Sequence, residues 1–336
     1  MRILVTGGAG YIGSHTVAEL VDHGHEVTVI DNLSQGHRQA LEPFPTVEFY
    51  QLSLFDEEAL TQIMREKGIE SVVHFAAFSL VGQSTKEPLL YYRNNVSGTE
   101  RLLSAMVTSG VKRIVFSSTA AVYGDPSTLP IPEGARTLPT NPYGETKLAI
   151  EKMLRWANEA YAIKSISLRY FNAAGAHTKY PIGEDHRPES HLIPLVLQTA
   201  LGQREAIHIY GCDYPTPDGS CVRDYIHVMD LASAHRLALE WLVENSGSQV
   251  FNLGNGLGFS VREVIEMAER VVGKPIPIVE SDRRWGDPAV LVASPERAKL
   301  TLGWKQEYPE LSDIIRSAWN WHSQHPYGYE HEYEQE

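Results

Sequence analysis

The sequence predicts an α/β protein with a doubly wound parallel sheet, and three observations lead to this fold class. Short apolar runs alternate with helical patterns through the first half of the chain. A glycine-rich run follows the first apolar run directly, and most of the helical patterns stop at a glycine. Such alternation is typical of parallel strands joined by right-handed crossovers. The expected fold is therefore Rossmann-type, with a smaller C-terminal α/β domain after it.

The first half contains the strands and helices of the predicted sheet. The helical patterns carry apolar residues at helical spacing, and three of them are followed by Gly24, Gly68 and Gly110, the residue type that favours the left-handed conformation at a helix end. The expected strands are 2–6, 26–30, 47–52, 71–76, 113–118 and 165–169, and the expected helices are 15–23, 56–67, 96–109 and 143–161.

The alternation breaks from about residue 171, where loops rich in Gly, Pro and His begin. A capping box, Ser260 with Glu263, predicts a helix that runs to residue 272. An extended run at 275–280, a helix start at Ser294-Pro295 and a last helix at 311–323 follow. This half is expected to form the smaller α/β domain, packed closely on the first.

Composition excludes several classes of function. A formal net charge of −13 works against binding to a phosphate backbone, so nucleic acid is not an expected partner. Cys212 and Cys221 lack C-x-x-C spacing and are expected to be free thiols in a reducing compartment. No basic leader and no long apolar segment is present, so we expect no signal peptide, no membrane association and a cytoplasmic location.

The histidines of the second half do not predict a metal site. His177, His186, His191, His208 and His227 show no H-x-x-x-H motif and no allied carboxylate at ligand spacing. We therefore expect loop-packing or solvated roles for them, and no bound metal.

The glycine-rich run Gly7 to Gly13 predicts a dinucleotide site. It lies between the first strand and a helix, where glycines allow a pyrophosphate to approach backbone N–H groups at the helix N-terminus. Asp31 ends the second strand, 18 residues after Gly13, where a carboxylate holds the adenosine ribose and repels the phosphate of NADP. NAD is the favoured cofactor, although Asp31 with Asn32 is also compatible with a simple turn.

Tyr143 and Lys147 are candidate catalytic residues because they lie four positions apart at the start of a helix. Asn141 as N-cap and Pro142 in the first turn predict that start. The neighbouring ammonium and the positive helix end are expected to lower the pKa of Tyr143, so that its phenol can accept a proton. Taken alone, the spacing favours a packed tyrosine and a snorkelling lysine, so other features of the chain must decide. Thr119, at the end of the fifth strand, supplies a hydroxyl as the third partner and favours the catalytic interpretation.

These residues resemble the extended short-chain dehydrogenase/reductase superfamily and, within it, the UDP-galactose 4-epimerase family. The resemblance covers nearly the whole chain. It is carried by the segments 7–15, 74–77, 91–96, 143–147, 169–172, 219–228 and 251–254.

The resemblance implies an isomerase that interconverts UDP-glucose and UDP-galactose. Tyr143 would take the proton of the C4 hydroxyl while hydride passes from C4 to tightly bound NAD. The 4-keto sugar would then rotate about its diphosphate linkage and take the hydride back on its other face. It further implies an NAD-binding domain at 1–170 with return segments at about 225–245, a mainly UDP-sugar-binding domain at 171–336, and a homodimer. The implied NAD contacts are Gly7, Gly10, Tyr11, Ile12, Gly13, Asp31, Asn32, Ser53, Leu54, Phe75, Ala76, Ala77, Ser79, Asn94, Ser117, Tyr143, Lys147 and Tyr170.

On the substrate side, the resemblance implies that Asn172, Arg223 and Arg284 hold the sugar diphosphate, for which the planar arginine fork is suited. Asp287 would contact the uridine ribose and Tyr210 the uracil. The full implied set is Thr119, Tyr143, Asn172, His191, Leu192, His208, Tyr210, Arg223, Arg284, Asp287 and Leu291.

Four positions depart from the pattern of many family members. Thr119 replaces a serine and keeps the hydroxyl, whereas Ser79 replaces a lysine and Ser53 an aspartate near the cofactor. Leu291 stands where a tyrosine blocks, or a small residue admits, N-acetylated sugars. Its intermediate bulk predicts a preference for UDP-glucose and UDP-galactose.

Several alternatives remain open. A 4,6-dehydratase is disfavoured because Ala120 and Ala121 offer no acid or base. A 4-epimerase of a UDP-N-acetylhexosamine, a UDP-pentose or UDP-glucuronate would keep the same core. A non-catalytic nucleotide-sensing protein is also compatible with the fold, but it would not need Thr119, Tyr143 and Lys147 together.

Overall fold

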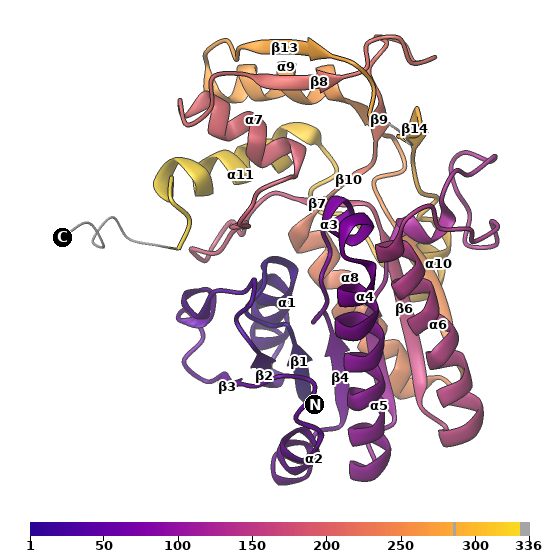
Figure 1. Ribbon diagram of the computed structural model, residues 1–336. Coiled ribbons are helices and arrows are strands. Elements are labelled where there is room, and N and C mark those ends of the chain that lie inside the picture. The colour runs from indigo at the N-terminus through magenta and orange to yellow at the C-terminus, as the bar shows by residue number, and fades with distance from the viewer. Residues whose placement is uncertain (285–286, 330–336) are drawn as a thin grey trace.

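A parallel sheet forms the framework of the first domain (Figure 1). The computed structural model describes residues 1–284 and 287–329. Within these residues seven strands pair in the order β11-β6-β5-β4-β1-β2-β3, each parallel to its neighbours. Their bounds are β1 Arg2–Thr6, β2 Glu26–Asp31, β3 Glu48–Gln51, β4 Ser71–His74, β5 Arg113–Ser117, β6 Lys164–Tyr170 and β11 Gln249–Leu253.

Two layers of helices cover the sheet, because side chains of successive strand residues point to opposite faces. Ile3 and Val5 of β1 belong to the core under one layer, while Leu4 belongs to the core under the other. The first layer holds α1 (Tyr11–Asp22) and α8 (Val228–Glu244), and the second holds α2 (Glu57–Glu66), α5 (Gly98–Ser109) and α6 (Pro142–Tyr161). The predicted doubly wound fold class is confirmed.

Some boundaries differ from those predicted. Strand β4 stops at His74 because Phe75 and Ala76 both turn their N–H groups to the carbonyl of Thr6, at 2.9 and 3.1 Å. Helix α1 begins four residues early, at Tyr11. Ahead of α5 the chain forms α3 (Val81–Lys86), α4 (Pro88–Tyr91) and a π-helical segment, Tyr92–Ser97.

The last strand of the sheet was not predicted. β11 pairs with β6 from Gln249 opposite Ile166 to Leu253 opposite Tyr170, and α8 leads the chain to it. The return of the chain to the first domain therefore extends to residue 253 rather than ending near 245.

The second domain stands above the sheet in Figure 1. Its core lies between α7 (Leu192–Ala200), α9 (Val261–Val272) and α11 (Leu311–Gln324), beside the parallel pair β8 (Ile207–Tyr210) and β13 (Ile278–Ser281). The capping box of Ser260 and Glu263 is formed as predicted. The remaining elements are the short strands β7 (Asn172–Ala174), β9 (Val222–Arg223), β10 (Tyr225–His227), β12 (Phe259–Ser260) and β14 (Val290–Leu291), helix α10 (Glu296–Leu302), and 3₁₀ turns at Arg38–Leu41 and Ala120–Tyr123.

Among the described residues, no helix combines the length and the apolar composition that a membrane crossing requires.

Candidate active site

A cavity of about 1700 Å³ opens where the carboxyl ends of the sheet strands meet the second domain. Ligands of open α/β sheets bind at this edge. Every residue predicted to contact the cofactor lines the cavity, from Gly7 on the first loop to Tyr170 at the end of β6. The sequence prediction thus placed these residues around one space, although their individual roles stay predictions.

The glycine loop requires glycine for steric reasons. Gly7 adopts a φ of +74°, and a Cβ on it would lie 2.6 Å from the backbone nitrogen of Ala76. A Cβ on Gly13 would lie only 2.1 Å from the carbonyl oxygen of Gly7. Ser14 donates its N–H to Gly10, which starts α1 at the cavity wall. The loop and the helix N-terminus therefore fit a pyrophosphate, which the backbone N–H groups of this first turn can bind.

Asp31 ties this loop to the end of β2. One carboxylate oxygen accepts the N–H of Ala9 at 3.0 Å, and the other accepts the N–H of Leu33 at 2.9 Å. The side chain is nearly buried, and this burial raises the pKa of the carboxyl. Because each carboxylate oxygen can accept more than one hydrogen bond, Asp31 retains acceptor capacity toward the cavity that it lines.

The catalytic candidates meet at the base of the cavity. Asn141 caps α6 by accepting the N–H of Gly144 at 2.9 Å, and Pro142 begins the helix, as predicted. Lys147 is 2 % exposed, and its ammonium donates to the carbonyl of Ser117 at 2.7 Å. Its nitrogen lies 5.9 Å from the ring centre of Tyr143. Thr119 follows β5 and forms a hydrogen bond with the Tyr143 hydroxyl.

The proton affinities differ from those expected. Burial raises the pKa of Tyr143 to about 12, and the hydrogen bond with Thr119 only partly opposes it. The prediction of a lowered tyrosine pKa is therefore wrong for this state of the protein, because desolvation outweighs the ammonium, which is turned toward Ser117. Burial lowers the pKa of Lys147 to about 7, against the opposing effect of the Glu151 carboxylate.

A buried charged network lies behind the catalytic residues. Arg169 on β6 donates through Nε to Glu151 on α6 at 2.9 Å, and the two side chains are 6 % and 8 % exposed. Ser118 donates to the same carboxylate, and Arg169 also donates to the hydroxyl of Tyr123 at 2.9 Å. The network joins α6, β6 and the end of β5, and so it holds together the elements that carry Tyr143, Lys147 and Thr119.

Two arginines also line the cavity. Arg223 and Arg284 both line it, which the sequence alone could not establish. The guanidinium of Arg223 lies 3.4 Å from the carboxylate of Asp287, and that of Arg284 lies 3.9 Å above the ring centre of Tyr210. Asn172 lines the same wall and donates to the carbonyl of Asp224 at 3.0 Å. Two arginines and an amide thus face one space, which is the donor set that a diphosphate requires.

Most of the other predicted substrate contacts also face the cavity. His191 and Leu291 line it, together with Thr119 and Asp287. Among the described residues, the lining does not include Leu192, His208 or Tyr210. Tyr210 lies beneath Arg284, His208 stacks on Tyr210, and Leu192 is the first residue of α7. These three remain predictions that the cavity as it stands does not support directly.

Comparison with known proteins identifies the family. Residues 3–254 match the model of the NAD dependent epimerase/dehydratase family. The chain belongs to this family. It is 59% identical over 329 residues to a UDP-glucose 4-epimerase of Halalkalibacterium halodurans, covering 98% of both chains. The resemblance drawn from the sequence is thereby confirmed.

Solved structures agree with this assignment. A crystal structure of a UDP-glucose 4-epimerase superposes with a TM-score of 0.96 at 52% identity, covering 98% of this chain and 100% of the other. The UDP-glucose 4-epimerase from Bifidobacterium longum, in complex with NAD⁺ and UDP, gives a TM-score of 0.93 at 41% identity, covering 98% and 100%. The predicted cofactor, NAD, is the cofactor of the epimerase/dehydratase family.

The glycine loop of this NAD-dependent epimerase/dehydratase offers a direct test. Gly13→Ala should lower the free energy of unfolding by about 1–3 kcal/mol, because its Cβ would overlap a backbone oxygen that cannot turn aside. The purified variant should also retain less NAD. Chemical denaturation and the absorbance of released nucleotide measure the two effects. Gly134→Ala is the control, since a Cβ there meets nothing within 4 Å; equal behaviour of the two variants would contradict the prediction.

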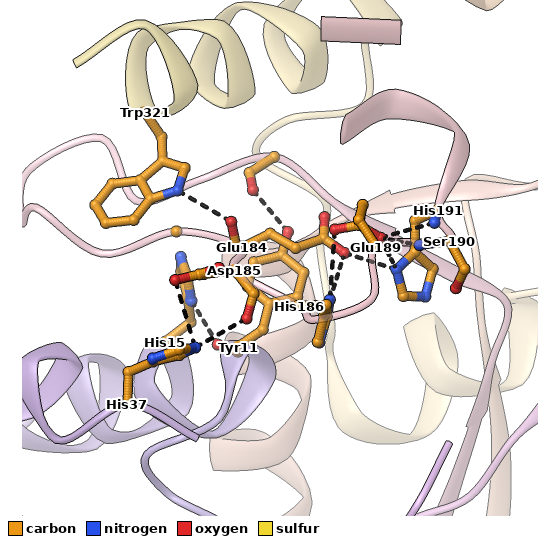
Figure 2. A network of polar contacts seen from close by, with 12 residues as sticks. Tyr11, His15, His37, Glu184, Asp185, His186, Glu189, Ser190, His191 and Trp321 are labelled. Carbon is orange, nitrogen blue, oxygen red and sulfur yellow. Dashed lines mark hydrogen bonds and ion pairs between the residues drawn. The ribbon is translucent and has the colours of Figure 1, made fainter. Parts of the chain in front are cut away.

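The sequence did not predict that four residues form one cluster, of which Glu184, His186 and His191 line the cavity. Glu184, His186, Glu189 and His191 come together on the loop before α7, with their ligand atoms within 4.8 Å of one another (Figure 2). The statement that the histidines lack allied carboxylates is therefore wrong. The sequence does contain a signal for this cluster, in the two E-x-H triplets at 184–186 and 189–191.

Proposed function

We propose that the chain is an NAD-dependent 4-epimerase that interconverts UDP-glucose and UDP-galactose. One observation carries the proposal: a single cavity is lined by Tyr143, Lys147 and Thr119 and also by Arg223 and Arg284. A proton acceptor beside a dinucleotide loop suits alcohol oxidation, and convergent arginines suit a nucleotide diphosphate. The relatives named UDP-glucose 4-epimerase support the same substrate class.

In the proposed reaction Tyr143 accepts the proton of the C4 hydroxyl and later returns it. NAD, which the glycine loop and Asp31 would hold, would supply the hydride acceptor and donor for C4 when bound. With a pKa of about 12, the phenol of Tyr143 is protonated at neutral pH in the absence of ligands and cannot readily accept a further proton. The positive charge of the oxidised nicotinamide ring, together with the nearby ammonium of Lys147, favours the phenolate. Thr119 keeps the phenol aligned through its hydrogen bond.

The remaining residues bind and orient the ligands. Arg223, Arg284 and Asn172 would hold the diphosphate, and Asp287 the uridine ribose. NAD would stay bound through the cycle, because the glycine loop and Asp31 enclose one end of the cavity while the second domain covers it. Protein purified without added NAD should therefore carry nucleotide, and nucleotide-free protein would contradict this part of the proposal.

The proposed enzyme works as a homodimer in the cytoplasm. Leu89, Tyr92 and Trp156 are apolar yet 82 %, 41 % and 64 % exposed, and they lie on α4, the π-helical segment and α6, which pack against one another. Burial of such a patch against a second copy is favourable. Light scattering that gave the mass of one 37.5 kDa chain would exclude the dimer. The free thiols of Cys212 and Cys221 suit a reducing compartment.

A panel of substrates tests the proposal and separates its rivals. The protein is incubated with UDP-galactose, UDP-N-acetylgalactosamine, UDP-xylose and UDP-glucuronate, and the products are separated by chromatography. We expect UDP-glucose from UDP-galactose as the fastest conversion. Faster turnover of another sugar would transfer the assignment to that 4-epimerase, and no turnover of any would favour a nucleotide-sensing protein.

Leu291 is expected to set the preference against N-acetylated sugars. It lines the cavity and packs beside Ala120 and Leu148, so its bulk narrows the space available to the sugar. Leu291→Ala should raise the turnover of UDP-N-acetylgalactosamine by roughly 10-fold, the usual effect of a few methylene groups in a pocket. Comparable turnover of UDP-galactose and UDP-N-acetylgalactosamine by the unmodified protein would refute this role.

A further inference from the structure

Two histidines and two glutamates alternate around a common point in the loop from Glu184 to His191. The Nδ1 atom of His191 lies 2.9 Å from a carboxylate oxygen of Glu184 and 2.9 Å from one of Glu189. The Nδ1 atom of His186 lies 3.1 Å from Glu184 and 3.7 Å from Glu189. Each imidazole therefore approaches both carboxylates, and Figure 2 shows the four side chains converging.

These separations match the edges of a metal coordination tetrahedron. Zinc binds imidazole nitrogen and carboxylate oxygen at about 2.0–2.2 Å, so neighbouring ligand atoms in a tetrahedron lie about 3.3–3.6 Å apart. The four His–Glu distances, 2.9, 2.9, 3.1 and 3.7 Å, fall on both sides of this value. One ligand atom from each of the four side chains lies within 4.8 Å of the others, so rotation of the side chains is needed to bring the more distant atoms to bonding distance from one ion.

Hydrogen bonds and an ion pair from neighbouring residues hold the loop that carries the cluster in place. The indole of Trp321 donates to the carbonyl of Glu184 at 3.1 Å, and Asp185 lies 3.4 Å from the ring of His37. One carboxylate oxygen of Glu189 accepts the N–H groups of Ser190 and His191 at 2.6 and 2.8 Å. Partners of this kind orient ligands before a metal arrives.

The cluster is enclosed on one side and open on the other. The glutamate side chains are 3 % and 6 % exposed, whereas those of His186 and His191 are 20 % and 40 % exposed. Both histidines line the large cavity, so an ion has a path of entry through it. A site with buried anionic ligands and reachable imidazoles fits a cation better than an anion.

We propose that Glu184, His186, Glu189 and His191 form a binding site for a divalent transition-metal ion of the zinc class. Two imidazole nitrogens with two carboxylates suit Zn²⁺, whereas Mg²⁺ and Ca²⁺ prefer oxygen ligands throughout. The site does not include Tyr143, Lys147 or Thr119, but Glu184, His186 and His191 line the same cavity as those residues. The ion fixes the loop that ends at His191, the N-cap residue of α7.

Titration with Zn²⁺ alone tests the site. The NAD-loaded protein is freed of metal with a chelator and dialysed, and ZnCl₂ is then added in a calorimeter. We expect one equivalent to bind, with no displacement by excess Mg²⁺. Loss of partners outside a ligand set typically costs 10–100-fold in metal affinity, so loss of a ligand in Glu189→Gln or His186→Gln should weaken binding by roughly 100-fold or more.

His23→Gln is the matched control, because His23 also lies beside a glutamate, Glu19, at 3.5 Å, but on the exposed surface and outside the cluster. It should bind Zn²⁺ as the unmodified protein does. Circular dichroism establishes that each variant is folded, and using both a glutamate and a histidine variant provides a second test if one of them is unstable. Absence of a one-equivalent site, or equal affinity in all variants, would overturn the proposal and leave the cluster as an internal ion-pair network.

Discussion

Tyr143→Phe should lower the rate of epimerisation by roughly 10²–10⁴-fold, the usual contribution of a positioned acid or base. The substitution removes one oxygen atom at the base of the cavity, and phenylalanine keeps the ring beside Lys147. NAD binding should persist, because the glycine loop and Asp31 lie on other elements. Turnover of UDP-galactose, measured together with the NAD content of the purified variant, separates the loss of a base from the loss of the cofactor.

Tyr161→Phe is the control for this experiment. Tyr161 ends the same helix, α6, and is 53 % exposed far from the cavity, so removal of its hydroxyl should leave turnover unchanged. Full activity of Tyr143→Phe would remove Tyr143 from the mechanism. Loss of NAD together with activity would instead assign Tyr143 a role in binding the cofactor.

Arg169→Met should destabilise the protein by about 3–5 kcal/mol. Without the guanidinium of Arg169, the carboxylate of Glu151 would remain buried with no opposite charge beside it, which is unfavourable. Activity should fall as well, because Glu151 also affects the proton affinity of Lys147. The free energy of unfolding in denaturant measures the first effect.

The double variant Glu151→Met with Arg169→Met tests this explanation. Removal of both charges leaves no uncompensated ion, so it should restore most of the lost stability. Lys67→Met breaks an exposed ion pair with Glu48 and should change stability little. If the single and double variants are equally unstable, the loss comes from packing rather than from the buried charge.

Local patterns predicted the first half of the fold well. The helix ends at Gly110, the N-cap at Asn141 and the capping box at Ser260 each depend on a few neighbouring residues, and each is formed. Strand β11 was not predicted because Gln249–Leu253 is short. It becomes a strand by pairing with β6, which lies more than 80 residues earlier in the chain. Such pairing depends on tertiary contacts rather than on a local signal.

The site divides in the same way. The glycine loop, Asp31, Thr119 and the Tyr143/Lys147 pair were predictable, because the ends of parallel strands meet at one edge of a sheet. The convergence of Arg223 with Arg284 was not, since 61 residues separate them and the second domain brings them together. The E-x-H triplets at 184–186 and 189–191 likewise become one cluster only because the loop folds back on itself.

The sequence by itself determined the class of fold and the cofactor and predicted the candidate catalytic side chains, because these follow from residue types at short spacings. Only the tertiary structure decided the pKa values of those side chains. The pKa of Tyr143 is raised rather than lowered, because burial desolvates the phenol and the hydrogen bond with Thr119 only partly opposes this effect. Burial and ion pairing arise from atoms that are remote in sequence, so no local pattern reports them.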